Sequence, residues 1–125
     1  EGNDVTIVAT GHLVWESIEA AKILNEIGIS AEVINIHTIK PLDKKIILDS
    51  VKKTRCIVSA EEHNFLGGLG ESISRVLAKN LPLPQEFVAT NDTFGESGTP
   101  AELMEKYGLN ADSIVEKVKK VIARK

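Results

Sequence analysis

The sequence is poor in the features that mark several large classes of protein. It has one cysteine, Cys56, so it forms no intrachain disulfide, which fits a reducing, cytoplasmic compartment. It has no run of about 18 apolar residues, so no membrane span is expected. Its formal net charge of −3 leaves no basic excess for phosphates, which argues against a nucleic acid partner. Residues 1–4 are polar, without signal-peptide character or an initiator methionine, so we interpret the chain as a processed or excised piece.

Length and composition fit one globular domain. A chain of 125 residues is long enough to bury one core, and 42% apolar with 26% charged residues is ordinary for such a domain. The sequence has no internal repeat, low-complexity segment or linker. We therefore treat residues 1–125 as a single domain.

Short β-branched runs alternate with segments of helical spacing. Runs at residues 5–10, 31–36, 56–60 and 86–89 predict buried strands, and the segments between them predict helices. Strands that alternate with helices favour a mostly parallel sheet with helices on both faces. The sequence therefore predicts a three-layer α/β/α fold.

Three helices carry specific predictions. Trp15, near the start of the first helix, is expected to be packed, and Thr99 with Pro100 is a strong start signal for a short helix. The apolar stripe expected to be buried in the first helix comprises Val14, Ile18, Ala20, Ala21, Leu24 and Ile27. The corresponding stripe in the helix after Gly68 comprises Leu69, Ile73, Val76 and Leu77, with Leu81 as a further candidate member.

The most informative stretch is residues 57–70, where a buried strand leads into two acids, a histidine, an asparagine and a glycine-rich turn. In an open α/β sheet, ligands meet the protein at the carboxyl ends of the strands. Glu61 and Glu62 are adjacent, so their side chains point to opposite faces, which disfavours paired acid–base catalysis. We expect one of them to be partly buried and to form hydrogen bonds that fix loops or cross an interface.

The glycines of this stretch have two interpretations. Gly67, Gly68 and Gly70 lie between a strand and a helix, where backbone amides could hold an anion. Their spacing matches neither the dinucleotide fingerprint nor a P-loop. A tight turn with close helix–strand packing is therefore favoured, and an anion site is the alternative.

The histidines do not form a recognised site. His12, His37 and His63 all follow predicted strands, so a three-histidine metal site is conceivable. None of them lies in a metal-ligand spacing, and no serine or cysteine nucleophile is recognisable near His63. We therefore predict no catalytic residue and no metal ligand in this chain.

Apolar side chains in loops at the strand ends favour docking. Phe65 and Leu66 follow one strand, and Phe94 lies in a glycine-bounded loop after another. Such side chains would be exposed in an isolated domain and buried against a partner. The predicted interface comprises Glu61, Glu62, His63, Asn64, Phe65 and Phe94.

Several segments together resemble one family, the C-terminal domain of transketolases. The similar segments are Glu-Glu-His-Asn at 61–64 with Gly-Gly-Leu-Gly at 67–70, the second-strand segment at 35–43, Asp-Thr-Phe-Gly-Glu-Ser-Gly-Thr-Pro at 92–100, Glu-Lys-Tyr-Gly-Leu at 105–109 and the first strand at 1–11. They cover essentially the whole chain in the right order. The β subunits of 2-oxoacid dehydrogenase E1 components and deoxyxylulose-phosphate synthase share this domain and stay as alternatives, as does a small anion-binding regulatory module.

The resemblance implies a sheet of about five strands, one of them antiparallel, and a structural role at a dimer interface. Transketolases, enzymes of the pentose phosphate pathway, use thiamine diphosphate with Mg²⁺ or Ca²⁺ to move a two-carbon ketol unit between sugar phosphates. That cofactor lies between a diphosphate-binding and a pyrimidine-binding domain, and this sequence carries neither domain's motif. We therefore expect that the fragment alone binds no cofactor and has no activity. Its expected partners are those two domains, on the same chain or a split subunit of a homodimer.

Overall fold

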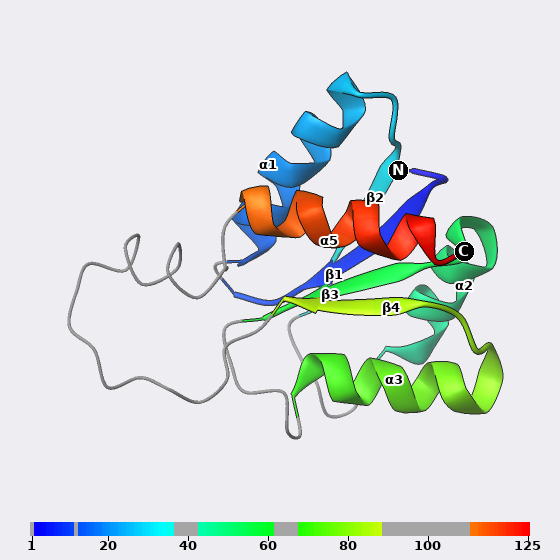
Figure 1. Ribbon diagram of the computed structural model, residues 1–125. Helices are drawn as coiled ribbons and strands as arrows, with labels where there is room; N and C mark the ends of the chain where they lie inside the picture. Colours follow the sequence, from blue (N-terminus) through cyan, green and yellow to red (C-terminus); the bar gives the residue numbers. More distant parts are fainter. Residues whose placement is uncertain (1, 12, 37–42, 62–67, 89–110) are drawn as a thin grey trace.

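The computed structural model describes residues 2–11, 13–36, 43–61, 68–88 and 111–125, and the statements below concern these residues. They form one sheet with helices on both sides (Figure 1). The strands are β1 (Val5–Ala9), β2 (Ala31–Asn35), β3 (Ile57–Ala60) and β4 (Gln85–Val88). The helices are α1 (Leu13–Glu26), α2 (Lys44–Thr54), α3 (Leu69–Asn80) and α5 (Ala111–Ala123).

The sheet has the strand order β2-β1-β3-β4, and each neighbouring pair is parallel. Parallel neighbours need a crossover connection, and the three crossovers run through α1, α2 and α3. All four strands of the described part are parallel, so the expected fifth, antiparallel strand is not among them. The helix expected at Thr99 lies outside the described residues.

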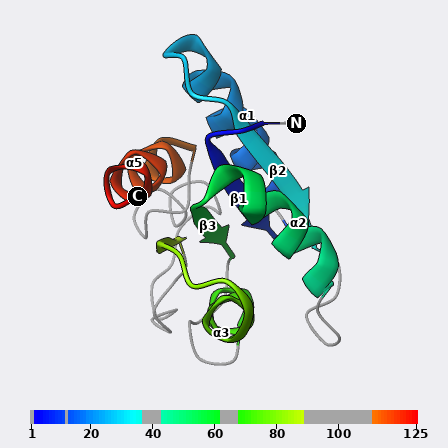
Figure 2. The same ribbon diagram turned by 90° about the vertical axis from the view of Figure 1, so that its right-hand side faces the viewer.

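Two apolar clusters hold the layers together, one on each face of the sheet. Side chains of α1 and α5 pack on one face, and side chains of α2 and α3 pack on the other (Figure 2). In β1, Ile7 belongs to the first cluster and its neighbour Val8 to the second, because successive side chains in a strand point to opposite faces. This arrangement confirms the predicted three-layer α/β/α fold.

Hydroxyl groups fix α2 to the centre of the sheet. Thr6 of β1 is fully buried, and its Oγ1 lies 2.7 Å from Ser50 Oγ and 2.7 Å from Thr54 Oγ1 of α2. Asp43 begins the helix, because its Oδ1 accepts a hydrogen bond of 3.2 Å from the Ile46 amide. Buried hydroxyls cost stability unless they are hydrogen-bonded, so this cluster fixes where α2 can lie on β1.

The prediction for α1 was partly wrong: Ala20 and Leu24 of the predicted stripe are buried, but Ile18 and Ile27 are exposed. The helix buries Leu13, Ser17, Ala20 and Leu24, and it exposes Trp15, Ile18, Ile23 and Ile27, the last of them just beyond its final residue. Trp15, expected to be packed, is 59% exposed. Two positions along a helix are about 200° apart, so burial of Leu13 turns Trp15 outward. The predicted stripe in α3 is confirmed for Leu69, Ile73, Val76 and Leu77, which are buried, whereas Leu81 directly follows the helix and is half-buried.

Helix α3 approaches the sheet closely at Gly70. A Cβ atom at this position would lie 2.5 Å from Phe87 Cδ2 of β4 and 2.8 Å from Ser59 Oγ of β3. Both distances are far below ordinary van der Waals contact, so a side chain here would push the helix away from the sheet.

We expect Gly70→Ala to lower the free energy of unfolding by about 1–3 kcal/mol, because the added methyl overpacks the contact with Phe87 and Ser59. Urea denaturation measures this change. The control is Ser72→Ala, a partly exposed position on the same helix, which should stay within about 0.5 kcal/mol of the parent chain. Equal stability of the two variants would contradict the close contact.

Candidate functional site

The predicted site lies at the carboxyl edge of the sheet, and the structure describes part of it. Glu61, Gly68 and Gly70 are among the described residues. The other predicted site residues lie outside them: Glu62, His63, Asn64, Phe65, Gly67 and Phe94. The interface and anion-site predictions for these positions therefore stay predictions.

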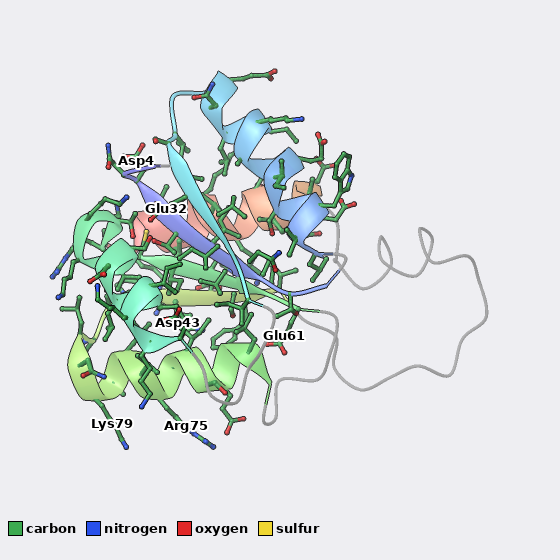
Figure 3. The ribbon with its side chains drawn as sticks, turned by 180° about the vertical axis from the view of Figure 1, so that it is seen from behind. Asp4, Glu32, Asp43, Glu61, Arg75 and Lys79 are labelled. Atoms are coloured by element: carbon green, nitrogen blue, oxygen red, sulfur yellow. The ribbon has the colours of Figure 1, made fainter. Side chains whose placement is uncertain are left out.

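Three hydrogen bonds fix the position of Glu61. It follows β3 directly, and its side chain is buried, with 1% of its surface exposed. Its backbone amide donates a hydrogen bond of 2.9 Å to the carbonyl oxygen of Val88 in β4. Its Oε1 accepts from the Leu69 amide at 2.9 Å, and its Oε2 accepts from the Gly70 amide at 2.6 Å. Figure 3 shows Glu61 beside the start of α3, at the end of the sheet where the strands finish.

A second group of polar contacts fastens the start of α3 to β4. The Nε2 atom of Gln85 donates to the Gly70 carbonyl oxygen at 3.0 Å and to Ser59 Oγ at 3.3 Å. Ser74 Oγ in turn donates to Gln85 Oε1 at 2.8 Å. The first turn of α3 is thus joined to the end of β3 by Glu61 and to the start of β4 by Gln85.

A carboxylate also lies at the start of α5. Glu16 of α1 accepts, through Oε1, a hydrogen bond of 2.9 Å from the amide of Ala111, the first residue of α5. The first amides of a helix have no partner within the helix and carry the positive end of its dipole. Sequence patterns near α3 and α5 could not reveal these caps, because Glu61 and Glu16 are distant in sequence from Gly70 and Ala111.

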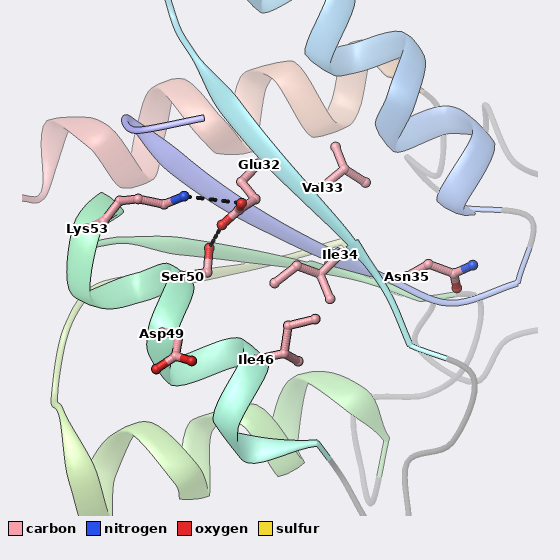
Figure 4. Close-up of a pocket in the computed structure, with 8 residues that line it drawn as sticks. All are labelled: Glu32, Val33, Ile34, Asn35, Ile46, Asp49, Ser50 and Lys53. Carbon is pink, nitrogen blue, oxygen red and sulfur yellow. Dashed lines mark hydrogen bonds and ion pairs between the residues drawn. The ribbon is translucent and has the colours of Figure 1, made fainter. Parts of the chain in front are cut away.

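A groove of about 430 Å³ lies between the edge strand β2 and helix α2 (Figure 4). Glu32 forms its polar end, where Oε1 accepts from Ser50 Oγ and Oε2 lies 3.2 Å from Lys53 Nζ. Asp49, the other acid of the groove, lies 2.8 Å from Lys45 Nζ. Both acids are paired with lysines, so the groove offers no unpaired charge to an ionic ligand. Sequence analysis did not single it out, because its residues come from two elements and form no motif.

The pKa values of Glu32 and Cys56 are shifted from their ordinary values. Burial raises the pKa of the Glu32 carboxyl, but the hydrogen bonds from Ser50 and Lys53 and the charge of Lys53 outweigh it, so the net pKa is lowered. Burial raises the pKa of the Cys56 thiol, which donates weakly to the Asp4 carbonyl oxygen at 3.4 Å. A buried thiol with a raised pKa is a poor nucleophile.

The described residues hold no group of three or more histidine, cysteine, aspartate or glutamate side chains placed to bind a metal ion. None of the helices described is both long and apolar enough to cross a membrane. The side chain that the described part places at the carboxyl edge, Glu61, forms hydrogen bonds that fasten α3 to β3.

The surface of α1 is the most apolar exposed feature of the described residues. Four of the five exposed large apolar side chains belong to it or directly follow it, namely Trp15, Ile18, Ile23 and Ile27. We call these four side chains the α1 apolar face. Single exposed apolar side chains are common, but four of them on one helix favour a partner.

Comparison with known proteins places the chain in a family. Residues 1–114 match the family described as transketolase, C-terminal domain. The chain is 46% identical over 125 residues to the 6-deoxy-6-sulfo-D-fructose transketolase subunit SqwH of Clostridium sp. (strain MSTE9), covering 100% of this chain and 39% of that protein. It is 42% identical over 120 residues to a putative transketolase C-terminal section of Methanocaldococcus jannaschii, covering 94% of this chain and 37% of that protein.

A solved structure agrees with these relatives. The chain superposes on a split gene transketolase described as an inactive beta4 tetramer, with a TM-score of 0.96 and 45% identity, over 100% of this chain and 41% of that one. The chain thus spans about two fifths of the length of these three proteins.

We expect the contribution of Glu32 to stability to depend on pH. Because its folded-state pKa lies below the ordinary value of 4.5, its stabilising effect is fully present above that value and is lost as the pH falls through the folded-state pKa. Glu32→Gln should therefore be less stable than the parent chain at pH 7, and the difference should shrink below about pH 4. Thermal denaturation over a pH series measures it.

The matched control is Asp49→Asn, which breaks the ion pair with Lys45 in the same groove. The Asp49 side chain is 54% exposed against 22% for Glu32, so solvent screens its pair more strongly and the loss should be smaller. A pH-independent effect of Glu32→Gln would contradict the stabilising role of the charged carboxylate.

Proposed function

The chain belongs to the family of transketolase C-terminal domains, and from this premise we propose that it is the non-catalytic docking domain of a larger transketolase-type enzyme. The observation that carries the proposal is the α1 apolar face, which is exposed in a chain spanning about two fifths of its relatives. When a partner removes the exposed apolar side chains of this helix from water, the free energy of the complex falls. The loop residues 62–65 and Phe94 remain part of the proposed interface.

We further propose what the complete enzyme does. It transfers a two-carbon ketol unit between sugar phosphates with thiamine diphosphate and a divalent metal, on which the transketolase family generally depends. Its active site is formed by a diphosphate-binding domain and a pyrimidine-binding domain. The enzyme lies in the cytoplasm and is a dimer of two identical halves, each of which is one chain or a pair of split subunits. These statements rest on family membership, supported by the transketolase names of the relatives.

The described residues do not fit the cofactor. A diphosphate would need unpaired amides or cations, but the first amides of α3 and α5 already donate to Glu61 and Glu16. A bridging metal would need gathered acids or histidines, and the described part gathers no such group. We therefore assign this domain no catalytic step.

The proposed partners are the other domains of the enzyme, on the same chain or on a separate subunit. Two relatives favour the separate arrangement. One is named as a C-terminal section and the other as a split gene transketolase in a beta4 tetramer, and each is longer than this chain. We propose that a pyrimidine-binding domain accompanies this domain in one subunit and that a second subunit supplies the diphosphate-binding domain.

We expect isothermal titration calorimetry of the chain with thiamine diphosphate and Mg²⁺ to show no micromolar binding, because in the described part the first amides of α3 and α5 already donate to carboxylates. The complete enzyme, titrated in the same buffer, is the positive control. Micromolar binding by the chain itself would overturn the non-catalytic assignment.

We expect Trp15 to become buried when the chain associates with the remaining domains of the enzyme. Trp15 is the single tryptophan of the sequence, so 5-fluorotryptophan incorporated into this chain gives one fluorine NMR signal, which should shift on association. Trp15→Ser should weaken association tenfold or more, since buried tryptophans dominate interface energies at roughly 1–2 kcal/mol or above. Its effect on the folding of the chain should be small, because the side chain is 59% exposed.

The matched control is Ile46→Ser. Ile46 is also exposed, at 45%, but it lies on α2, on the opposite side of the sheet from α1. Association should be unchanged by this substitution. An unmoved fluorine signal, or equal weakening by both variants, would show that α1 is not the docking surface.

A further inference from the structure

The start of α3 has the geometry of an anion site, and the chain itself supplies the anion. The amides of Leu69 and Gly70 donate to the two oxygens of one carboxylate, at 2.9 and 2.6 Å. Helix α3 has 12 residues, so its dipole and its first amides, which have no partner within the helix, favour a negative charge at this end. The ligand in the structure is Glu61, eight residues before Leu69.

The residues next to the start of α3 provide no side-chain acceptor for its first amides, so a residue outside the helix provides it. The N-cap residue of α3 is Gly68, which forms no side-chain cap hydrogen bond. Serine, threonine, aspartate or asparagine usually provides that oxygen from the N-cap itself. Here the oxygens come from the end of β3, and the backbone hydrogen bond from Glu61 to Val88 fixes the strand that carries them.

The site is also shielded from water. The exposed fraction of Glu61 is 1%, so its carboxylate has exchanged nearly all of its hydration for these contacts. A buried carboxylate is stable only when hydrogen bonds replace that hydration, and bonds to a charged acceptor are about twice as strong as neutral ones. The two amides and the burial therefore suit a carboxylate that fits the space of the Glu61 side chain.

We propose that the start of α3 is a buried carboxylate-binding site whose ligand is the side chain of Glu61, and that acetate takes the site when that side chain is removed. Glu61→Ala deletes a CH₂ and a carboxylate group, which together have nearly the size and charge of acetate. Formate is shorter than the deleted group, and propionate and phosphate are larger. In the parent chain the site is full, so it does not bind inorganic phosphate.

The same contacts give Glu61 a positioning role. Through its amide and its carboxylate, it joins the end of β3 to the end of β4 and to the start of α3. Glu61 thus fixes the end of β3, the end of β4 and the start of α3 relative to one another.

Thermal denaturation of the full 125-residue chain tests the proposal. Glu61→Ala in sodium chloride should lower Tm by about 5–15 °C, because two charge-assisted hydrogen bonds are lost. Sodium acetate at the same ionic strength should raise the Tm of this variant by several degrees, with saturation, and should act more strongly than formate, propionate or phosphate. The parent chain should respond equally to acetate and chloride.

Two control variants separate ligand binding from a general salt effect. Glu61→Gln keeps the volume of the side chain, so it blocks the site and should show no selective response to acetate. Asp43→Ala removes the exposed cap of α2, where no buried pocket surrounds the amides, so it should also show none. An equal response of Glu61→Ala to acetate and chloride, or an equal acetate response in Glu61→Gln, would overturn the proposal.

A refolding assay applies if Glu61→Ala does not fold in chloride. The recovered soluble fraction should then be at least about threefold higher in acetate than in chloride, because a ligand of the native state raises its population. Equal recovery in the two salts would overturn the proposal. This inference does not depend on the docking role, so either one can fail without the other.

Discussion

The carboxyl edge of this domain depends on one buried carboxylate. A buried Glu61 carboxylate is costly without strong hydrogen bonds, and the N-cap residue of α3, Gly68, offers no side-chain acceptor for the first amides of the helix. The hydrogen bonds between the Glu61 carboxylate and the amides of Leu69 and Gly70 meet both requirements. Because the amide of Glu61 also bonds to Val88, the contact sets the relative positions of β3, β4 and α3 at the edge where α/β proteins place their ligands.

Close packing of α3 on the sheet completes this arrangement. Gly70 leaves room for Phe87 and Ser59, and Gln85 bonds to the carbonyl oxygen of the same glycine. The glycine is therefore needed for contact with the sheet, while its amide serves Glu61. The first turn of α3 thus needs a residue without a side chain at position 70 and an amide that bonds to Glu61. These two needs explain the glycine at this position, although the segment lacks the spacing of a nucleotide-binding loop.

The sequence predicts the layers well because its strands and three of the described helices have clear patterns. In α3 the apolar residues lie on one face, so their spacing identifies the buried side. In α1 large apolar residues lie on both faces, and the buried face includes Ser17, whose hydroxyl has no hydrogen-bond partner in the part of the chain described. Spacing alone then cannot decide between the two faces. The predicted stripe included Ile18 and Ile27, which the structure exposes.

The caps at α3 and α5 could not be predicted for a different reason. Helix-start rules look for an oxygen within about four residues of the first turn, whereas Glu61 is eight residues before Leu69 and Glu16 is 95 residues before Ala111. Only the fold brings these carboxylates to the helices. They change the electrostatics of the edge, because a phosphate approaching α3 would meet a carboxylate already bonded to the amides, and like charges repel. The feature that many α/β proteins use to hold a ligand is used here to hold the domain together. The docking role proposed for this chain therefore draws on other surfaces, among which the α1 apolar face holds four of the five exposed large apolar side chains of the described part.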